Sequence, residues 1–374
     1  MKHIYLDYNA STPLAAEVRE TIVNTLDQSS GNPSASHWAG IPAKKAVENA
    51  RLQVTELISA ECEEIIFTSG GTEANNHALK GVWDALGRPG SQIITTTIEH
   101  PAILEPCRYL KNKGAALTWI GVDEHGVVDP AEIEAAITED TILISVMHAN
   151  NETGSIQPLK EISSIAKKYG VLLHCDAAQS IGKIPVHVDE LGVDLLSVAG
   201  HKLYAPKGVG ALYVRSGTPL ESFMHGAGHE RGRRAGTENV ILAAALGRAS
   251  ELALEMEEIS IKWRSLTDFF FQQLKRTFGE KVQLNGHPDE RLPNTLNVSF
   301  LGEIGQEVLA RMPEVAASTG ASCHSDIVQL SPVLRAMGIS EERGKGAIRF
   351  SLGRASSMDD IEYVIKKLKE IIEE

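Results

Sequence analysis

Short runs of β-branched and apolar residues alternate with amphipathic helical stretches between residues 43 and 214, and this alternation strongly constrains the fold. It is typical of parallel strands joined by helical crossovers. The expected strands are 64–68, 92–96, 116–120, 141–147, 171–175, 195–198 and 210–214. The expected helices are 72–86, 102–113, 130–137 and 159–169, preceded by one that starts at Pro42. The sequence therefore predicts an α/β fold with a mostly parallel central sheet.

The rest of the chain predicts a smaller second unit. Residues 238–278 carry a long helical pattern with an acidic face, which we expect to bridge the two units. Strand patterns at 295–300 and 348–352 and a closing helix from Met358 then predict a small α+β unit. We therefore expect a large domain over 12–260 and a small domain formed by 1–11 and 261–374. The glycine-rich stretch 224–236 is expected to be a mobile or interface loop.

Charge and composition narrow the class of partner. The chain has 374 residues and a formal net charge of -13, which argues against nucleic acid or an anionic membrane as the main partner. Small molecules are the expected ligands. We see no signal-peptide core and no run of about eighteen apolar residues, so we expect a cytoplasmic protein. The four cysteines lack the spacing of a disulfide framework or a metal site, so we expect reduced thiols and no metal.

Two chemically distinctive residues stand just past expected strands. Asp176 follows the apolar run 171–175, and Lys202 follows the run 195–198 after a Gly-His pair. A pyridoxal phosphate site needs an acid that keeps the pyridine nitrogen protonated and a lysine whose amine forms a Schiff base. Either residue alone would mean little, but the pair predicts such a site.

A second signal lies where the expected strand 64–68 turns through two glycines into the next helix. The backbone amides of Gly71 and Thr72 at the helix amino end, together with the Thr72 hydroxyl, would suit a phosphate dianion. Gly-Gly turns before helices are common, so this motif alone is weak. Together with Asp176 and Lys202 it is stronger, because the chain then offers partners for both the pyridine ring and the phosphate of one cofactor.

Ten further segments carry a resemblance to a known family. They are YLDYNASTP at 5–13, GNPS at 31–34, TSGGTE at 68–73, EH at 99–100, HANNETG at 148–154, HCDAAQS at 174–180, GHK at 200–202, RAGTEN at 234–239, GASC at 320–323 and SLGR at 351–354. In this order they resemble the NifS/IscS-type cysteine desulfurases, which are class V, fold-type I pyridoxal phosphate enzymes. The resemblance runs from end to end and is far more specific than any single motif.

The resemblance implies a role for each matching residue around the cofactor ring. Lys202 would hold the cofactor covalently, and Asp176 would partner the pyridine nitrogen. Gln179 would contact the ring hydroxyl, and Asn151 would contact cofactor and substrate. His100 would stack on the ring and is a candidate proton shuttle, although without the family match a packed core histidine is the better interpretation.

The resemblance also implies which residues hold the phosphate. They are Gly71, Thr72 and His201, with Thr237 reaching the phosphate from the partner subunit, so a homodimer is implied. Ala199 stands among these cofactor contacts where many desulfurases have a serine, so one hydroxyl donor is missing and weaker cofactor binding is expected.

Substrate binding falls on Arg354, whose guanidinium suits a bidentate grip on the α-carboxylate of an amino acid. Without the SLGR match, a surface salt bridge is the better interpretation. Arg335 and Arg349 lie nearby in the sequence and are expected to be structural.

Cys323 decides the expected reaction, because a desulfurase needs a thiol nucleophile and an ordinary aminotransferase does not. It lies in a polar, glycine-containing stretch, 318–325, that we expect to be exposed and movable. The neighbouring His324 is a candidate for lowering the pKa of this thiol. Cys175 is expected to pack in the core, and Cys62 and Cys107 are expected to be inert.

The resemblance implies conversion of L-cysteine to L-alanine, with sulfur leaving as a persulfide on Cys323 to an acceptor protein. A selenocysteine lyase is a close alternative, because the segments 323–326 and 331–334 are also similar to those enzymes. A class V aminotransferase or epimerase is disfavoured by the complete GASC motif, and a non-catalytic scaffold by the intact Lys202 and Asp176. The acceptor stays open between iron–sulfur cluster assembly, tRNA thiolation, DNA modification and selenium recycling.

Overall fold

A computed structural model of the chain describes residues 3–319, 321–323 and 328–373. Its larger part is built on a seven-stranded sheet with the strand order β2-β8-β7-β6-β5-β3-β4. The strands are β2 (Ile65–Thr68), β3 (Gln92–Thr96), β4 (Ala116–Ile120), β5 (Thr141–Met147), β6 (Leu172–Asp176), β7 (Leu195–Ala199) and β8 (Gly210–Val214). All seven lie within one residue of their predicted bounds. β8 is antiparallel to both of its neighbours, while the other pairs are parallel, so the predicted mostly parallel sheet is confirmed.

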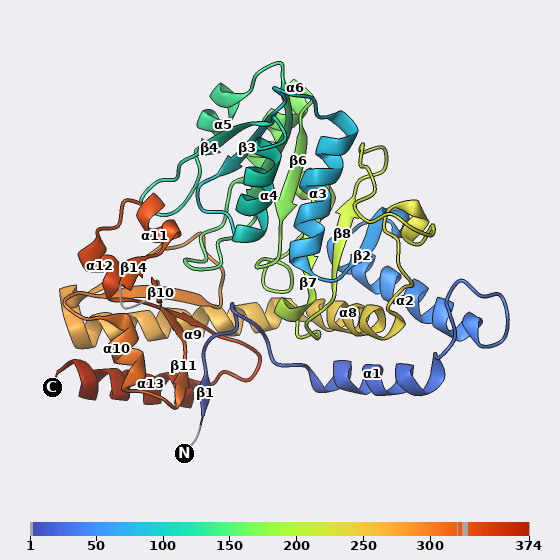
Figure 1. Cartoon of the computed structure of the whole chain (residues 1–374). Helices are drawn as coiled ribbons and strands as arrows, with labels where there is room; N and C mark the ends of the chain where they lie inside the picture. Colours follow the sequence, from blue (N-terminus) through green and yellow to red (C-terminus); the bar gives the residue numbers. More distant parts are fainter. Residues whose placement is uncertain (1–2, 320, 324–327, 374) are drawn as a thin grey trace.

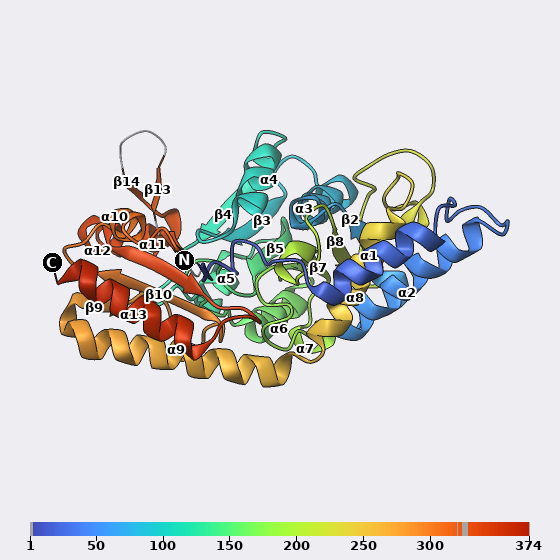
Figure 2. The same cartoon turned by 90° about the horizontal axis from the view of Figure 1, so that it is seen from below.

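Helices cover both faces of this sheet (Figures 1 and 2). The crossover helices are α3 (Gly71–Leu86), α4 (Pro101–Lys111), α5 (Pro130–Ala136), α6 (Leu159–Tyr169) and the short α7 (Val188–Leu191). A second group consists of α1 (Ala16–Gln28), α2 (Gly40–Ile58) and α8 (Val240–Ala253), which pack against one another. Nothing in the sequence analysis predicted α1, because its hydrophobic pattern is weak and only two of its residues, Val18 and Thr25, are buried.

The stretch predicted as one long helix forms two, α8 and α9 (Met256–Phe278), separated at Leu254 and Glu255. α9 leads into the smaller part of the molecule (Figure 1). The predicted domain boundary at residue 260 falls inside this continuous helix. The division into 12–260 and 1–11 with 261–374 stays a prediction.

The smaller part contains a four-stranded antiparallel sheet of order β12-β15-β10-β9, as the predicted α+β pattern indicated. Its strands are β9 (Val282–Leu284), β10 (Thr295–Phe300), β12 (Ser318–Thr319) and β15 (Ala347–Ser351). The helices around it are α9, α10 (Gly305–Ala310), α11 (Pro332–Ala336), α12 (Glu341–Lys345) and α13 (Met358–Ile372). Trp263 and Phe270 of α9 are buried, and the ring of Phe270 lies 4.9 Å from that of Phe350 on β15, so this helix anchors the small sheet.

Two short strand pairs complete the structure. β1 (Ile4–Tyr5) lies parallel to β11 (Val315–Ala316), so these two residues lie against the small part. β13 (Ala321–Cys323) and β14 (Val328–Leu330) pair with each other as an antiparallel hairpin, which projects from the small part in Figure 2. Four single turns of 3-10 helix are also present: η1 (Cys62–Glu64), η2 (Gly200–Lys202), η3 (Glu230–Gly232) and η4 (Gly279–Lys281). In the described part of the chain, no helix has the length and apolar character needed to span a membrane.

Candidate active site

A cavity of about 500 Å³ lies where β5, β6 and β7 end. This is the edge of a parallel sheet at which ligands usually bind. Nine residues that the sequence predicted for the site line it: Gly71, Thr72, His100, Asn151, Asp176, Gln179, Ala199, His201 and Lys202. The structure thus brings together residues that are up to 131 positions apart in the chain, from Gly71 to Lys202.

Asp176 is the last residue of β6, and its carboxylate has two hydrogen-bond donors. The side-chain amide of Asn75 donates to Oδ2 at 2.7 Å, and the backbone N–H of Ala178 donates to Oδ1 at 3.0 Å. Only 7% of Asp176 is exposed. These bonds fix the orientation of a buried carboxylate at the cavity wall.

Lys202 ends the 3-10 turn η2, which follows β7. Its Nζ donates to the backbone oxygens of Asn9 and of Ala10, the latter at 2.8 Å. Burial and, next, the positive charge of Arg349 lower the pKa of this amine to about 8, while Asp176 opposes the shift. A larger fraction of the amine is therefore uncharged near neutral pH than in an exposed lysine.

The amino end of α3 forms one wall of the cavity. Gly70 has a φ of 148°, which L side chains rarely adopt, and it allows the sharp turn from β2 into the helix. A Cβ on Gly71 would lie only 3.2 Å from the Cβ of Ala199, so the strand β7 and this turn approach each other closely. Helix amino ends attract anions through their free N–H groups and the helix dipole.

Two histidines lie beside Lys202 in the cavity. His100 caps the amino end of α4, where its Nδ1 accepts a hydrogen bond from the Ala102 N–H at 3.1 Å. Burial lowers its pKa, and the charge of Lys202 acts in the same direction. Burial and the same lysine lower the pKa of His201 to about 4. His201 is therefore a neutral imidazole at neutral pH.

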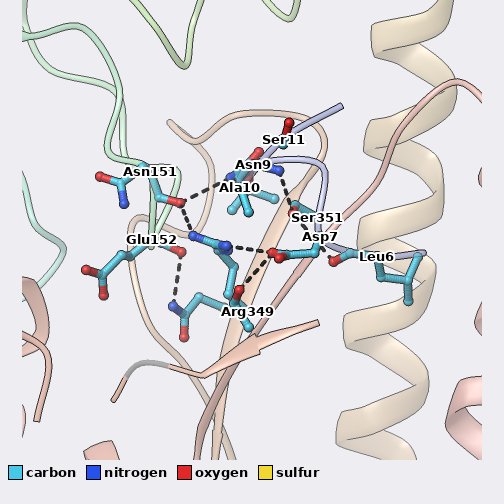
Figure 3. Close-up of polar contacts among 12 residues, drawn as sticks. Leu6, Asp7, Asn9, Ala10, Ser11, Asn151, Glu152, Arg349 and Ser351 are labelled. Atoms are coloured by element: carbon cyan, nitrogen blue, oxygen red, sulfur yellow. Dashed lines mark hydrogen bonds and ion pairs between the residues drawn. The ribbon is translucent and has the colours of Figure 1, made fainter. Parts of the chain in front are cut away.

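Arg349 is a cavity residue that the sequence analysis expected to be only structural. It is 8% exposed, and its guanidinium donates to Asp7 Oδ1 at 2.6 Å and to the Asn151 backbone oxygen at 3.0 Å. Figure 3 shows it between these two partners. Its buried Nε has no hydrogen-bond partner among the described residues. The guanidinium is thus held in place with a donor still uncommitted.

Arg354, the arginine predicted to bind substrate, lies elsewhere. Its guanidinium forms an ion pair with Glu17 at 3.5 Å and lies 5.8 Å from the ring centre of Tyr204. It is not among the residues that line the cavity. Arg354 follows β15 by three positions, whereas Arg349 lies within β15 and lines the cavity. Substrate binding by Arg354 stays a prediction.

Thr237 also lies outside the cavity of its own chain. It is exposed and lines a neighbouring hollow together with Ser69 and Gly208, which border the cavity as well. The single chain therefore leaves open the prediction that Thr237 reaches a partner subunit's phosphate site.

Cys323 is the last residue of β13, paired with Val328 of β14. The structure describes its backbone, and His324 lies outside the described residues. Cys175 is fully buried, with a thiol pKa that burial raises well above its ordinary value, and burial raises the pKa of Cys107 to about 12. Neither is a thiolate at neutral pH.

Asn9 lines the cavity, although the sequence analysis assigned it no role beyond its place in the segment 5–13. Its backbone oxygen accepts hydrogen bonds from Lys202 and from Gln179 Nε2, and its side chain donates to Thr295 Oγ1 at 2.9 Å. The signal that could have found it is the polar run at 7–12 directly after an apolar residue pair. That run gives no indication of which part of the sheet it meets.

The residues present fit pyridoxal phosphate. A fixed carboxylate, Asp176, and an amine with a lowered pKa, Lys202, line the same cavity, and a glycine turn at a helix amino end provides an anion site beside them. A buried oxygen, Asn75 Oδ1, also lacks a partner among the described residues. The cavity volume is within the range of small-molecule sites.

Comparison with known proteins agrees with this chemistry. The family model described as "Aminotransferase class-V" matches residues 4–364. A "Cysteine desulfurase IscS" of Dictyoglomus turgidum is 46% identical over 375 residues, covering 100% of this chain and 95% of the relative. Another protein of that name, from Methanosarcina thermophila, is 43% identical and covers 100% of this chain and 92% of the relative.

Solved structures give the same answer. A "NIFS-LIKE PROTEIN" superposes with a TM-score of 0.93 at 37% identity and covers 99% of both chains. A structure described as "SspA in complex with cysteine" superposes with a TM-score of 0.81 at 34% identity, covering 93% of this chain and 98% of that one. The chain therefore belongs to the class V aminotransferase family, in its NifS/IscS-type cysteine desulfurase branch.

Proposed function

We propose that the protein is a pyridoxal 5′-phosphate-dependent cysteine desulfurase that converts L-cysteine to L-alanine and passes sulfur, as a persulfide on Cys323, to an acceptor protein. The observation that carries this proposal is the meeting of Lys202, Asp176 and the glycine turn at the amino end of α3 around one cavity. Whole-length relatives named cysteine desulfurases support it.

Pyridoxal phosphate, when bound, supplies an electron sink for the bonds that break at the substrate α-carbon. Asp176 would hold the ring nitrogen, Gln179 the ring oxygen, and Gly71, Thr72 and His201 the phosphate. Lys202, with its pKa of about 8, can both take a proton from the α-carbon and return one near neutral pH. The neutral His100 can lie against the ring and relay a proton.

Arg349 replaces Arg354 as the proposed ligand of the substrate carboxylate. It lines the same cavity as Lys202, whereas Arg354 does not. Asp7 and the Asn151 backbone oxygen hold the guanidinium, so it pays little conformational entropy when a carboxylate binds.

Cys323 would act as the nucleophile toward the substrate sulfur. Its thiolate forms a new S–S bond while the substrate C–S bond breaks, and protonation of the carbon product gives alanine. A thiol of the acceptor protein then takes the outer sulfur, the S–S bond breaks, and the Cys323 thiolate is regenerated. The hairpin β13–β14 places this cysteine on the small part of the molecule, beside β12 and ahead of Arg349 in the chain.

A homodimer in the cytoplasm is the proposed state of the enzyme. Large apolar side chains are exposed in α1 (Leu26 at 56%), just before α2 (Trp38 at 86%) and at the start of α2 (Ile41 at 56%). Such a surface is typical of a protein interface. The exposed Thr237 would then be free to reach the phosphate site of the partner subunit.

The test is a product assay with matched substrates. Purified protein with pyridoxal phosphate and dithiothreitol, which reduces the persulfide to sulfide, is incubated with L-cysteine, L-selenocysteine, or an amino acid with a keto acid. We expect sulfide and alanine in equal amounts from L-cysteine, with loss of sulfide in Cys323→Ser. Turnover of selenocysteine alone would assign a selenocysteine lyase instead, and consumption of the keto acid unaffected by Cys323→Ser would assign an aminotransferase.

A further inference from the structure

A lysine without a role in the proposed reaction lies in the interior behind the cavity. Lys183 is 3% exposed, and its Nζ donates to Gln179 Oε1 at 2.6 Å and to Asn9 Oδ1 at 2.9 Å. Both partners are neutral amide oxygens. Lysines are almost never buried unless they are paired, so this placement calls for a specific reason.

The two hydrogen bonds of Lys183 do not require a charged amine. Burial lowers its pKa well below the ordinary value, and the positive charges of Lys202 and Arg349 act in the same direction. An uncharged amine still carries two N–H groups, which is the number that Asn9 and Gln179 accept. Lys183 can therefore serve as a neutral double donor in the interior.

Its first partner, Gln179, lines the cavity with an amide whose two ends have opposite chemistry. Gln179 Nε2 donates to the Asn9 backbone oxygen at 2.9 Å, while Oε1 accepts from Lys183. The Asn9 oxygen needs a donor and the Lys183 amine needs an acceptor. Both contacts therefore favour one orientation of the Gln179 amide, with Nε2 toward Asn9 and Oε1 toward Lys183. The second N–H of Gln179 Nε2 donates to neither of these groups.

Its second partner, Asn9, holds Lys202. The Asn9 backbone oxygen accepts from Lys202 and Gln179, while its side-chain oxygen accepts from Lys183 and, at 3.1 Å, from Asn294 Nδ2. Lys183 therefore supports two cavity residues from behind without lining the cavity itself.

We propose that Lys183 is a positioning residue that locks the Gln179 amide with its nitrogen, not its oxygen, available to the cavity. This inference rests on the proposed function, in which Gln179 contacts the ring oxygen of pyridoxal phosphate. A donated N–H stabilises the ionised ring oxygen, whereas a reversed amide would present an oxygen and repel it. Lys183 thereby sets the pH at which the bound cofactor titrates.

The test is a spectroscopic pH titration of the cofactor-loaded protein. Lys183→Met keeps the length of the side chain and removes both donors, so we expect the midpoint of the visible absorbance change to rise by about one pH unit. Lys183→Gln, which can restore one donor, should lie between Lys183→Met and the wild type. Lys160→Met, at a lysine exposed on α6, is the matched control and should leave the midpoint unchanged.

A double-mutant cycle ties the effect to Gln179. Gln179→Met alone should raise the midpoint, and Lys183→Met in that background should add almost nothing, because there is no amide left to orient. Should Lys183→Met not fold, as judged by circular dichroism, Lys183→Leu provides a second apolar variant with the same expected result.

A folded Lys183→Met or Lys183→Leu variant with the wild-type midpoint would overturn the inference, as would additive shifts in the cycle. These outcomes differ from failure of the proposed function. In that case the wild-type protein itself would bind no pyridoxal phosphate and show no visible absorbance band.

Discussion

The cavity at the edge of the large sheet and the hairpin that carries Cys323 are built in contrasting ways. The cavity residues are held by buried hydrogen bonds that cross the molecule, such as those of Asp176 with Asn75 and of Arg349 with Asp7. β13 and β14 form a sheet of two strands that pair only with each other in the described structure. The comparison indicates that the groups proposed to bind cofactor and substrate are fixed, while the proposed sulfur nucleophile is carried on a separate unit.

The largest expected effect separates these two regions directly. Lys202→Ala should lower turnover of L-cysteine by more than about 10⁴-fold and abolish covalent cofactor attachment. Cys323→Ser should lose persulfide and sulfide production to a similar extent, yet retain the visible cofactor band and its change on addition of L-cysteine. Absorbance spectra and a sulfide assay measure both, with Cys62→Ser as control. Loss of cofactor binding in Cys323→Ser would break the proposed separation.

The next effect tests which arginine belongs to the cavity. Arg349→Lys keeps a positive charge beside Asp7 but loses the planar fork, so the KM for L-cysteine should rise about 100-fold. Arg354→Ala removes a partly exposed ion pair with Glu17 and should change the KM by less than about threefold. Steady-state kinetics of both variants give the comparison. The reverse ranking would restore Arg354 as the substrate ligand.

A smaller effect concerns the stability contributed by Glu99, a buried residue next to the cavity residue His100. Burial raises the pKa of Glu99 to about 8, and its Oε2 has no partner among the described residues. Between pH 4.5 and 8 the folded state holds a proton that the unfolded state has lost, so this residue makes stability fall as pH rises. Glu99→Gln removes that dependence while its Oε1 can still accept from Thr96 and from Met147 N–H.

We therefore compare the free energy of unfolding of Glu99→Gln with that of the wild type. The variant value minus the wild-type value should increase by about 2 kcal/mol between pH 6 and pH 8. Urea unfolding of the cofactor-free protein at several pH values measures it. Glu132→Gln, at an exposed residue of α5, is the control and should show no such growth. A constant difference across this range would mean that Glu99 is ionised in the folded protein.

The smallest effect is the reactivity of a single amine. Because burial and Arg349 lower the pKa of Lys202 to about 8, its reductive methylation in the cofactor-free protein should rise with pH to a midpoint near 8. Lys160, an exposed lysine on α6, is the reference amine. Peptide mass spectrometry follows both in one sample. A shared midpoint would show that the cavity does not activate Lys202.

Periodicity predicted the large sheet well, because its strands are apolar, buried and separated by helices with clear patterns. It did not predict that β8 runs antiparallel, since a strand buried on both faces looks the same in either direction. It also gave one helix for α8 and α9, because the break at Leu254 and Glu255 contains neither glycine nor proline.

Motifs placed most of the cavity residues, because side chains that directly follow parallel strands meet at one edge of the sheet. They did not indicate Arg349, which lies in the other part of the molecule. Arg349 and Arg354 are separated by five positions, and only the register of β15 with β10 and the contact with Asp7 put Arg349 into the cavity. Lys183 gave no signal at all, because a lysine is normally exposed.

The wall of the cavity around Lys202 is formed where residues 7–9 meet residues 349–351 of β15. The N–H of Asn9 donates to Ser351 Oγ across a separation of 342 residues, and Arg349 reaches Asp7 over a similar span. While the chain is being made, a ribosome that has not yet translated β15 carries a nascent protein without this wall. The proposed coenzyme can therefore meet a finished site only once β15 has left the ribosome, so its insertion would have to follow the synthesis of that strand.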